Sequence, residues 1–185
     1  VDRNDKRSIH FVVLERMSAD GLARVIGNMR LIIKKQDESP LPVEEDFPGV
    51  FEDGRAPLGS TEVSRLISCH ENSAVQNLTK WPLFRQGLNY VKQHELGPVF
   101  GVVTESFERS LLRQGIPLRA LSEARFLEHI RSEKKPALVD VEALKEVMRR
   151  INTKNVPTSC DVFSCQNFNT TQSISDLELN LGAVA

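Results

Sequence analysis

The sequence predicts an α/β domain whose mixed sheet begins with antiparallel strands, and two observations carry this prediction. The first is a pair of β-type runs at residues 8–16 and 22–35, joined by turn residues in the pattern of a hairpin. The second is a strand–helix–strand succession over residues 61–104. The right-handed crossover rule predicts that its two strands lie side by side and run parallel. The expected order is hairpin, long loop, β, α, β, α, β, β, α.

Composition restricts the function classes. The chain has 185 residues and a mass of 20.8 kDa, enough for one domain with a sizeable core. A formal net charge of -1 gives no general attraction to nucleic acid. No apolar run reaches the length of a membrane span, and no apolar signal segment begins the sequence. Because Cys69, Cys160 and Cys165 lack metal-ligand spacing, a reduced cytoplasmic setting and no bound metal are expected.

The hairpin is followed by a long connection at residues 36–60, which contains four prolines. Loops of this length inside a compact domain are uncommon and often cover a binding site. Three consecutive acids in this loop, Glu44, Glu45 and Asp46, are expected to form a solvated face.

The strand expected at residues 61–68 contains the charged residues Glu62 and Arg65, and Arg30 interrupts the second run of the hairpin. A charge in a sheet is costly unless it finds a partner, so these groups indicate either a structural ion pair or a reaction site. Strand periodicity places Glu62 and Ser64 on one face, with Val63 and Arg65 on the other.

The second half of the chain predicts two strand–helix units. An apolar stripe at steps of three or four predicts a helix over residues 77–96, with Pro82 near its start. Lys134, Lys135 and Pro136 are expected to form a turn. The remaining expected elements are a buried strand at 99–104, a helix at 105–114 ended by Gly115, an extended segment at 116–129, a strand at 137–141, a helix at 141–151, and a tail at 152–185.

Two motifs in this order resemble the GNAT acyltransferase superfamily. They are VIGNMRL at residues 25–31 and EVSR at residues 62–65, and the segments at 107–121 and 136–144 resemble the same proteins. The resemblance is to the branch of acyl-homoserine-lactone synthases and long-chain N-acyl amino acid synthases, such as N-acyltyrosine synthases. It implies one GNAT-like domain over residues 1–151, with a mostly antiparallel central sheet flanked by helices and a splayed pair of parallel central strands.

The resemblance also implies the acyl donor. GNAT enzymes that use coenzyme A hold its pyrophosphate in a Q/RxxGxG/A loop, and nothing between Val103 and Gly115 matches that loop. The synthase branch instead takes a fatty acyl chain from the 4'-phosphopantetheine arm of acyl carrier protein, so the protein itself is expected to bind no cofactor. An acidic carrier protein needs a basic docking patch. The candidates are Arg109, Arg113, Arg119, Lys134 and Lys135.

Departures from the family pattern concern the start of the chain and the two motifs. Family members have further chain before the hairpin, so their early Arg, Phe and Trp positions are not assigned here. Asp2 and Asp5 fit the family's DxxD placed just before the first strand. Homoserine-lactone synthases tend to read RLLPT and SRF, whereas this chain has Arg30-Leu31-Ile32 and Ser64-Arg65-Leu66, which favours the N-acyl amino acid branch.

The implied reaction is attack by the α-amine of a free amino acid on an acyl thioester. Glu62 is the expected base, and backbone N–H groups from Ser64 to Leu66 are the expected oxyanion donors. Arg65 and Arg30 would orient Glu62 or bind a carboxylate. The acyl chain would lie between the strands at 61–68 and 99–104, against residues such as Leu66, Val99 and Phe100.

Three alternatives stay open on sequence grounds. An acyl-homoserine-lactone synthase would use S-adenosylmethionine as the amine. A non-catalytic module would bind an acyl group without turnover. A purely structural role predicts that Glu62 and Arg65 pair with each other and are closed off from any cavity.

Overall fold

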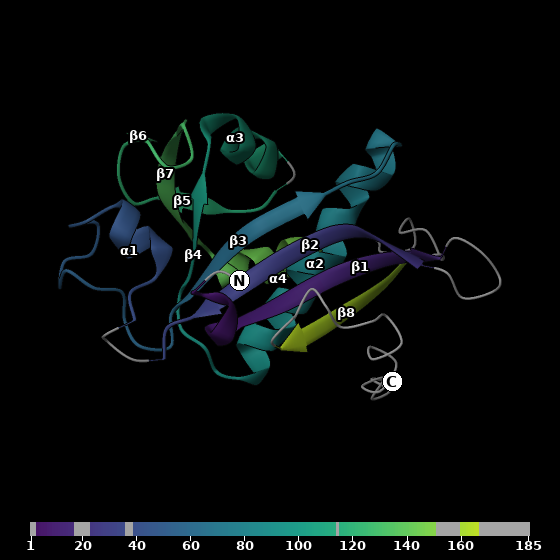
Figure 1. Cartoon of the computed structure of the whole chain (residues 1–185), viewed down its shortest axis with the longest axis horizontal. Helices are drawn as coiled ribbons and strands as arrows, with labels where there is room; N and C mark the ends of the chain where they lie inside the picture. Colours follow the sequence, from purple (N-terminus) through teal and green to yellow (C-terminus); the bar gives the residue numbers. More distant parts are fainter. Residues whose placement is uncertain (1–2, 17–22, 36–38, 114, 151–159, 167–185) are drawn as a thin grey trace.

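The computed structural model describes residues 3–16, 23–35, 39–113, 115–150 and 160–166 (Figure 1). One eight-stranded sheet forms the centre of the molecule, in the order β5-β7-β4-β3-β2-β1-β8, with β6 pairing to β7. The strands are β1 (Ser8–Arg16), β2 (Ala23–Ile33), β3 (Thr61–Ser68), β4 (Val99–Val103), β5 (Leu118–Ala120), β6 (Arg125–Leu127), β7 (Ser132–Val139) and β8 (Cys160–Gln166). The helices are η1 (Asp5–Arg7), α1 (Pro42–Asp46), α2 (Ser73–Gln93), α3 (Glu105–Arg113) and α4 (Val141–Arg150).

The predicted fold class is confirmed, including its one parallel pair. β3 and β4 run parallel, and every other strand pairing is antiparallel. The parallel pairing extends only from Thr61–Val99 to Val63–Gly101, although β3 continues to Ser68. The two central strands therefore part beyond Val63, and this opening in the sheet positions the candidate site.

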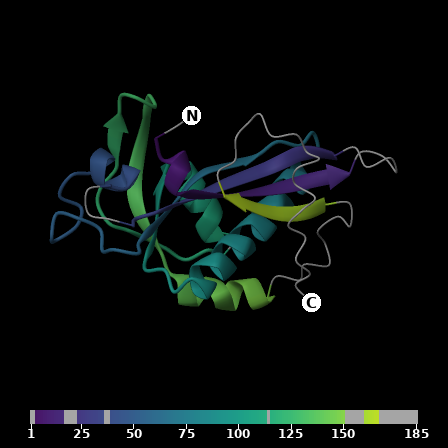
Figure 2. The same cartoon turned by 60° about the horizontal axis from the view of Figure 1, so that its bottom comes forward.

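The two faces of the sheet bury different clusters. One face packs on α2 and α4, which lie together beneath the strands (Figures 1 and 2), and its core includes Phe11, Met29 and Phe84. The other face carries a smaller cluster around Phe47 and Phe100, formed with α1 and the β6–β7 hairpin. The residues of β3 alternate between these faces, so Val63 contacts the first cluster and Glu62 points to the second side.

Helix α2 begins four residues earlier than predicted, so the prediction that Pro82 lies near its start is wrong. The Asn72 side chain accepts hydrogen bonds from Ala74 N at 2.9 Å and Val75 N at 3.4 Å, and this N-cap begins the helix at Ser73. Pro82 lies inside the helix and leaves one backbone carbonyl without its helical donor. Burial of Trp81, Leu83 and neighbours against the sheet offsets that loss.

The predicted turn at Lys134, Lys135 and Pro136 is also wrong, because these residues belong to β7. The Pro136 carbonyl accepts from Leu121 N at 2.9 Å, just beyond the end of β5. The N–H and C=O of one strand residue point to the same side, so an N–H at position 136 would also point toward β5. Its absence in Pro136 therefore removes no hydrogen bond between β7 and β4. The extended segment expected at 116–129 is divided into β5 and β6.

Strand β8 lies at the β1 edge of the sheet, inside the range for which the sequence predicted only a tail. Residues 152–159 and 167–185 lie outside the described residues, as do Asp2 and the turn expected between β1 and β2. None of the helices in the described part of the chain is long and apolar enough to cross a membrane. Within those same residues, no group of three or more His, Cys, Asp or Glu side chains could hold a metal ion.

Candidate active site

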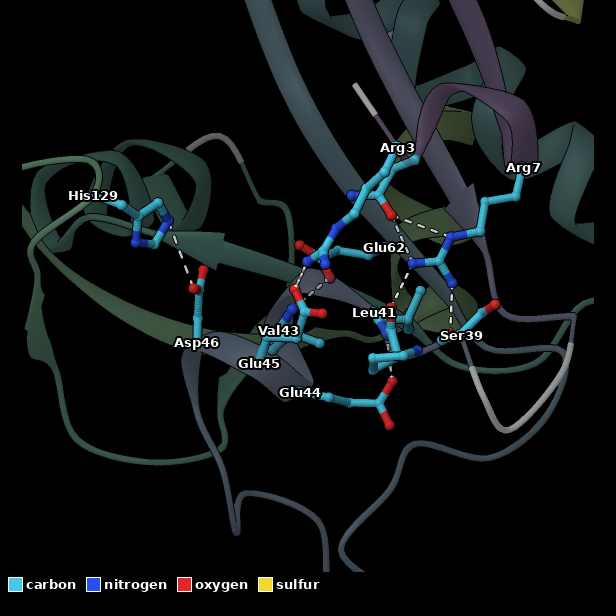
Figure 3. A network of polar contacts seen from close by, with 12 residues as sticks. Arg3, Arg7, Ser39, Leu41, Val43, Glu44, Glu45, Asp46, Glu62 and His129 are labelled. Carbon is cyan, nitrogen blue, oxygen red and sulfur yellow. Dashed lines mark hydrogen bonds and ion pairs between the residues drawn. The ribbon is translucent and has the colours of Figure 1, made fainter. Parts of the chain in front are cut away.

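Glu62 is a buried carboxyl group on the central strand β3. Its cross-strand neighbours are Ile32 on β2 and Phe100 on β4, both apolar, and the residue is 3% exposed. Its Oε2 accepts a hydrogen bond from Val43 N at 2.8 Å, from the first turn of α1 (Figure 3). Burial raises the pKa of Glu62 to about 8, against the smaller opposing effects of the Val43 hydrogen bond and the charges of Arg30 and Arg7.

Helix α1 is held over Glu62 by contacts of its own acidic side chains, of which Glu44 is the most buried. Pro42 begins the helix, where its missing N–H loses nothing. Glu44 Oε1 accepts from Lys34 Nζ at 2.7 Å and from Ala56 N at 2.9 Å, and Glu44 Oε2 accepts from Leu41 N at 2.5 Å. The Lys34 side chain is 0% exposed and that of Glu44 is 5% exposed. This buried pair fixes the loop against the end of β2.

The prediction that the acidic cluster is a solvated face is wrong for Glu44, whose side chain is buried, whereas Glu45 is exposed. Each of its three members contacts a basic side chain from a different part of the chain. Glu44 binds Lys34, the residue after β2. Glu45 binds Arg3 before η1, and Asp46 lies 3.6 Å from His129 of the β6–β7 turn (Figure 3). Charge pairing thus holds α1 between the start of the chain and the hairpin. Arg7 adds a further contact, donating from Nη1 to Ser39 O at 2.6 Å.

A row of polar side chains crosses β1, β2 and β3 on the Glu62 face. His10, Arg30 and Ser64 are opposite one another in the strand register. Arg30 donates from Nε to Ser64 Oγ at 2.8 Å and from Nη1 to Asp5 Oδ1 at 2.9 Å. The same Asp5 oxygen lies 3.7 Å from His10 Nε2, and burial lowers the pKa of His10.

Arg65 reaches the same acid by way of a break in the strand register. Residues Arg65 and Leu66 together oppose Met29, since the pairing jumps from Arg30–Ser64 to Asn28–Ile67. Arg65 has a positive φ of 51°, and its Nη1 lies 3.8 Å from Asp5 Oδ1. Simple period-two alternation, which separated Arg65 from the face of Ser64, therefore fails at this bulge.

The structural alternative predicted a mutual ion pair between Glu62 and Arg65. Among the described residues Glu62 forms no ion pair with Arg65; its carboxylate contacts the backbone of α1 and Arg65 lies near Asp5. The bulge thus places the two side chains in different surroundings: Glu62 is buried, and Arg65 is half exposed.

The opening between β3 and β4 holds an apolar cavity of about 390 Å³. Residues 63–66 and 101–104 form its two strand walls, and Phe84, Phe107, Leu111 and Ile116 close it on the helical side. Its size is in the range of small-molecule sites. Of the predicted acyl-chain residues, Leu66 lines this cavity, as do the site residues Ser64 and Arg65.

Two other predicted acyl-chain residues lie elsewhere. Val99 lines a smaller void deeper in the core. Phe100 lies on the opposite face and packs edge-to-face on Phe51, with ring centroids 5.0 Å apart. Glu62 is not among the residues that line the 390 Å³ cavity; it lies on the face of β3 that α1 covers, next to the last paired residue, Val63.

The predicted docking residues are spread around α3 and β7. Arg109 is exposed and lies 3.4 Å from Glu105, and Arg113 donates from Nε to Arg109 O at 3.2 Å. Lys135 forms an ion pair with Glu108. Lys134 lines the cavity, and Arg119 is exposed on β5. Of the five predicted docking residues, Lys134 alone is among the residues that line the cavity.

Sequence reasoning missed Lys34 and Val43. Lys34 ends an apolar run, where a solvated lysine is the ordinary expectation. Pro42-Val43-Glu44 has the pattern of a helix start, with proline first and an acid in the first turn. A helix start predicts backbone N–H groups without a partner inside the helix, and Glu62 accepts a hydrogen bond from one of them. It does not predict which strand residue receives them.

Comparisons with known proteins agree on the fold. No family model matches the sequence, and neither does any curated protein. The solved structure of BjaI, a CoA-dependent acyl-homoserine lactone synthase, with SAM and isopentyl-CoA is similar with a TM-score of 0.60 at 18% identity, over 84% of this chain and 70% of BjaI. MesI, also a CoA-dependent acyl-homoserine lactone synthase, gives 0.56 at 22% identity, over 80% and 71%. FeeM, an N-acyl amino acid synthase from uncultured soil microbes, gives 0.50 at 12% identity, over 64% and 63%.

The chain therefore has the fold shared by acyl-homoserine lactone synthases and an N-acyl amino acid synthase. This likeness confirms, at the level of the fold, the resemblance that the VIGNMRL and EVSR motifs predicted.

Proposed function

We propose that the protein is an N-acyltransferase that moves a long-chain fatty acyl group from a carrier-protein thioester to the α-amine of a free amino acid. The observation that carries the proposal is the position of Glu62, a buried carboxyl with a pKa of about 8, on the strand that parts from β4 around an apolar cavity. A carboxyl group whose pKa lies near neutrality is suited to remove a proton at physiological pH.

In the proposed reaction the amine nitrogen attacks the thioester carbonyl and forms the new C–N bond. The tetrahedral intermediate then collapses, the C–S bond breaks, and the thiolate leaves. Before attack, Glu62 takes one proton from the ammonium group, directly or through one water, so that the neutral amine can react, and this proton passes to solvent. The nitrogen of the tetrahedral intermediate then loses a second proton through the same base, and this proton ends on the departing sulfur. The products are an N-acyl amino acid and the free thiol of the carrier.

The strand opening supports the remaining roles. Backbone N–H groups between Ser64 and Leu66 lie where β3 has lost its pairing to β4, so they are the candidate donors to the oxyanion. Arg65 borders the cavity and is the candidate ligand of the amino acid carboxylate. Arg30 and Asp5 act on Arg65 and Ser64 as positioning residues, because Arg30 joins Ser64 to Asp5.

Acyl carrier protein is the proposed donor, and its 4'-phosphopantetheine arm would bring the thioester to the opening. In support, the first turn of α3, where a GNAT pyrophosphate would bind, contains Glu105 and Glu108. Lys134, Arg119, Arg109 and Arg113 are the candidate contacts to the acidic carrier. An acyl-CoA donor is the competing choice, because BjaI and MesI are CoA-dependent.

A second candidate function is acyl-homoserine lactone synthesis with S-adenosylmethionine as the amine. The fold likeness to BjaI, whose structure was solved with SAM, favours it. The two candidates share the acylation step and differ in the acceptor; the second also needs the carboxylate of the acylated acceptor to close the lactone ring, with breakage of the C–S bond to the sulfonium.

The deciding experiment offers the purified protein acyl-carrier-protein or acyl-CoA thioesters together with either the free amino acids or S-adenosylmethionine. Free thiol is quantified, and the product is identified by mass spectrometry. We expect an N-acyl amino acid from the carrier-protein thioester. Glu62→Gln should abolish turnover while the variant stays folded, with Glu52→Gln, an exposed acid of the same loop, as the matched control. Full turnover by Glu62→Gln would remove the base assignment, and acyl binding without product would identify a binding module.

A further inference from the structure

Behind the 390 Å³ cavity lies a second, smaller apolar space. It has a volume of about 20 Å³ and is enclosed by side chains of β2, β3, α2, β4, β7 and α4, all of them hydrocarbon, thioether or glycine. This is room for about one water molecule, but no polar group is present to hold it. The void and the larger cavity share Val63, Phe84 and Val139 in their walls.

Phe84 is the large member of this shared wall. It is a buried residue of α2 and lines both spaces, so its ring belongs to the wall that they share. Val63 and Val139 are smaller and are held in strands of the sheet. Removing the Phe84 ring would therefore join the cavity to the void without disturbing a strand.

The far side of the void depends on Met29 and Gly87. A Cβ atom built at Gly87 would lie 2.5 Å from Met29 Cε, so the methionine terminus fills the place that a side chain at position 87 would need. Both residues line the void. Methionine is unbranched and flexible, so a methyl group at position 87 would push its terminus aside, into the void that it borders.

We propose that Phe84 sets the length of the acyl chain that the cavity accepts, and that the void behind it is closed by Met29. The proposal rests on the proposed acyl-transfer function and adds the specificity-determining residue to it. The chain enters along the parted strands β3 and β4 and its methyl end stops against the Phe84 ring. Longer chains gain no further burial.

Binding of free fatty acids tests the proposal without any turnover. We expect the affinity of the wild-type protein for saturated fatty acids to rise about fourfold for each added methylene, the factor that burial of one CH₂ group gives. The rise should stop at a defined chain length, here called the breakpoint. Displacement of a fluorescent fatty-acid probe measures the affinities.

Phe84→Ala should move the breakpoint to a longer chain, and Phe84→Leu should move it less, which provides a milder variant if the alanine form does not fold. Gly87→Ala alone should leave the breakpoint unchanged. Combined with Phe84→Ala, it should cancel the extension, because the displaced Met29 terminus fills the opened void. Leu83→Ala is the matched control, since Leu83 is a buried neighbour on α2 that lines neither space.

Four results would overturn the proposal. They are an absence of fatty-acid binding by the wild type, an unmoved breakpoint in both Phe84 variants, an equal shift in Leu83→Ala, and a shorter breakpoint in Gly87→Ala alone. Failure of the acyl-transfer proposal is a separate outcome. It would appear as normal chain-length-dependent binding with no product from any thioester and amine.

Discussion

Replacing Glu62 by glutamine should make the protein more stable, and the gain should depend on pH in a defined way. Glutamine keeps the size of the side chain and an oxygen that accepts the Val43 N–H, but it has no charge to bury. In the wild-type protein, burial raises the pKa of Glu62 from an ordinary value of 4.5 to about 8. The folded form therefore prefers a protonated, neutral Glu62.

The size of the effect follows from the two pKa values. Below pH 4.5 the carboxyl is protonated in both the folded and the unfolded chain, and its contribution to stability is fully present. Between 4.5 and 8 the unfolded chain releases the proton while the folded one retains it, so wild-type stability falls as the pH rises. Above 8 the accumulated loss reaches about 5 kcal/mol, which Glu62→Gln avoids.

Urea unfolding of both proteins at a series of pH values measures this difference. The free energies of unfolding should agree below pH 4.5 and separate progressively up to pH 8. Glu52→Gln, which changes an exposed acid of the same loop, controls for loss of a surface charge. Parallel wild-type and Glu62→Gln curves across the whole range would refute the burial argument. The same proton should appear in the kinetics, with turnover rising with pH toward about 8 as the base loses its proton.

Three further substitutions test the surroundings of the site, each by urea unfolding. Lys34→Met leaves the Glu44 carboxylate buried without its cation and should cost about 3–5 kcal/mol. Gly27→Ala places a methyl group 2.4 Å from Thr79 Cγ2 on α2 and should cost about 1–3 kcal/mol. His129→Ala removes only an exposed contact of α1 and should change stability by less than about 1 kcal/mol.

Each of these substitutions has a control in the same chain. Adding Glu44→Gln to Lys34→Met should recover part of the lost stability, because no unpaired charge then stays buried. Gly101→Ala, whose new methyl meets only Val63 O at 3.9 Å, should be tolerated better than Gly27→Ala. A loss for His129→Ala as large as that for Lys34→Met would contradict the division into buried and exposed contacts.

Sequence patterns predicted the strand that carries the site, because Thr61–Ser68 contains residues typical of strands and a glycine precedes it. They did not predict the bulge at Arg65, since the alternation of a strand gives no sign of an inserted residue. The face assigned to Arg65 depended on unbroken alternation. A single residue with positive φ was enough to bring Arg65 to Asp5.

The acidic loop shows a second limit of sequence reasoning. Glu44, Glu45 and Asp46 have the composition of a solvated segment, and only the fold brings Lys34, Arg3 and His129 to them. Lys34 is ten positions from Glu44, whereas His129 is far along the chain from Asp46. Helix propensity and charge pattern describe neighbours within a few residues, so partners chosen by tertiary packing lie outside their reach.

The same loop connects the charge of Glu62 to the closing of the site. Burial is the largest cause of the raised pKa of Glu62, and α1 supplies part of that burial together with the Val43 hydrogen bond. A displacement of α1 would admit water to the carboxyl, lower its pKa and favour the charged form. Of the three contacts that hold α1, the Lys34–Glu44 pair is buried, whereas Arg3 and His129, the partners of Glu45 and Asp46, are exposed. Salt weakens exposed pairs far more than buried ones, so α1 would be released first at its Arg3 and His129 contacts while Lys34 keeps it attached to β2.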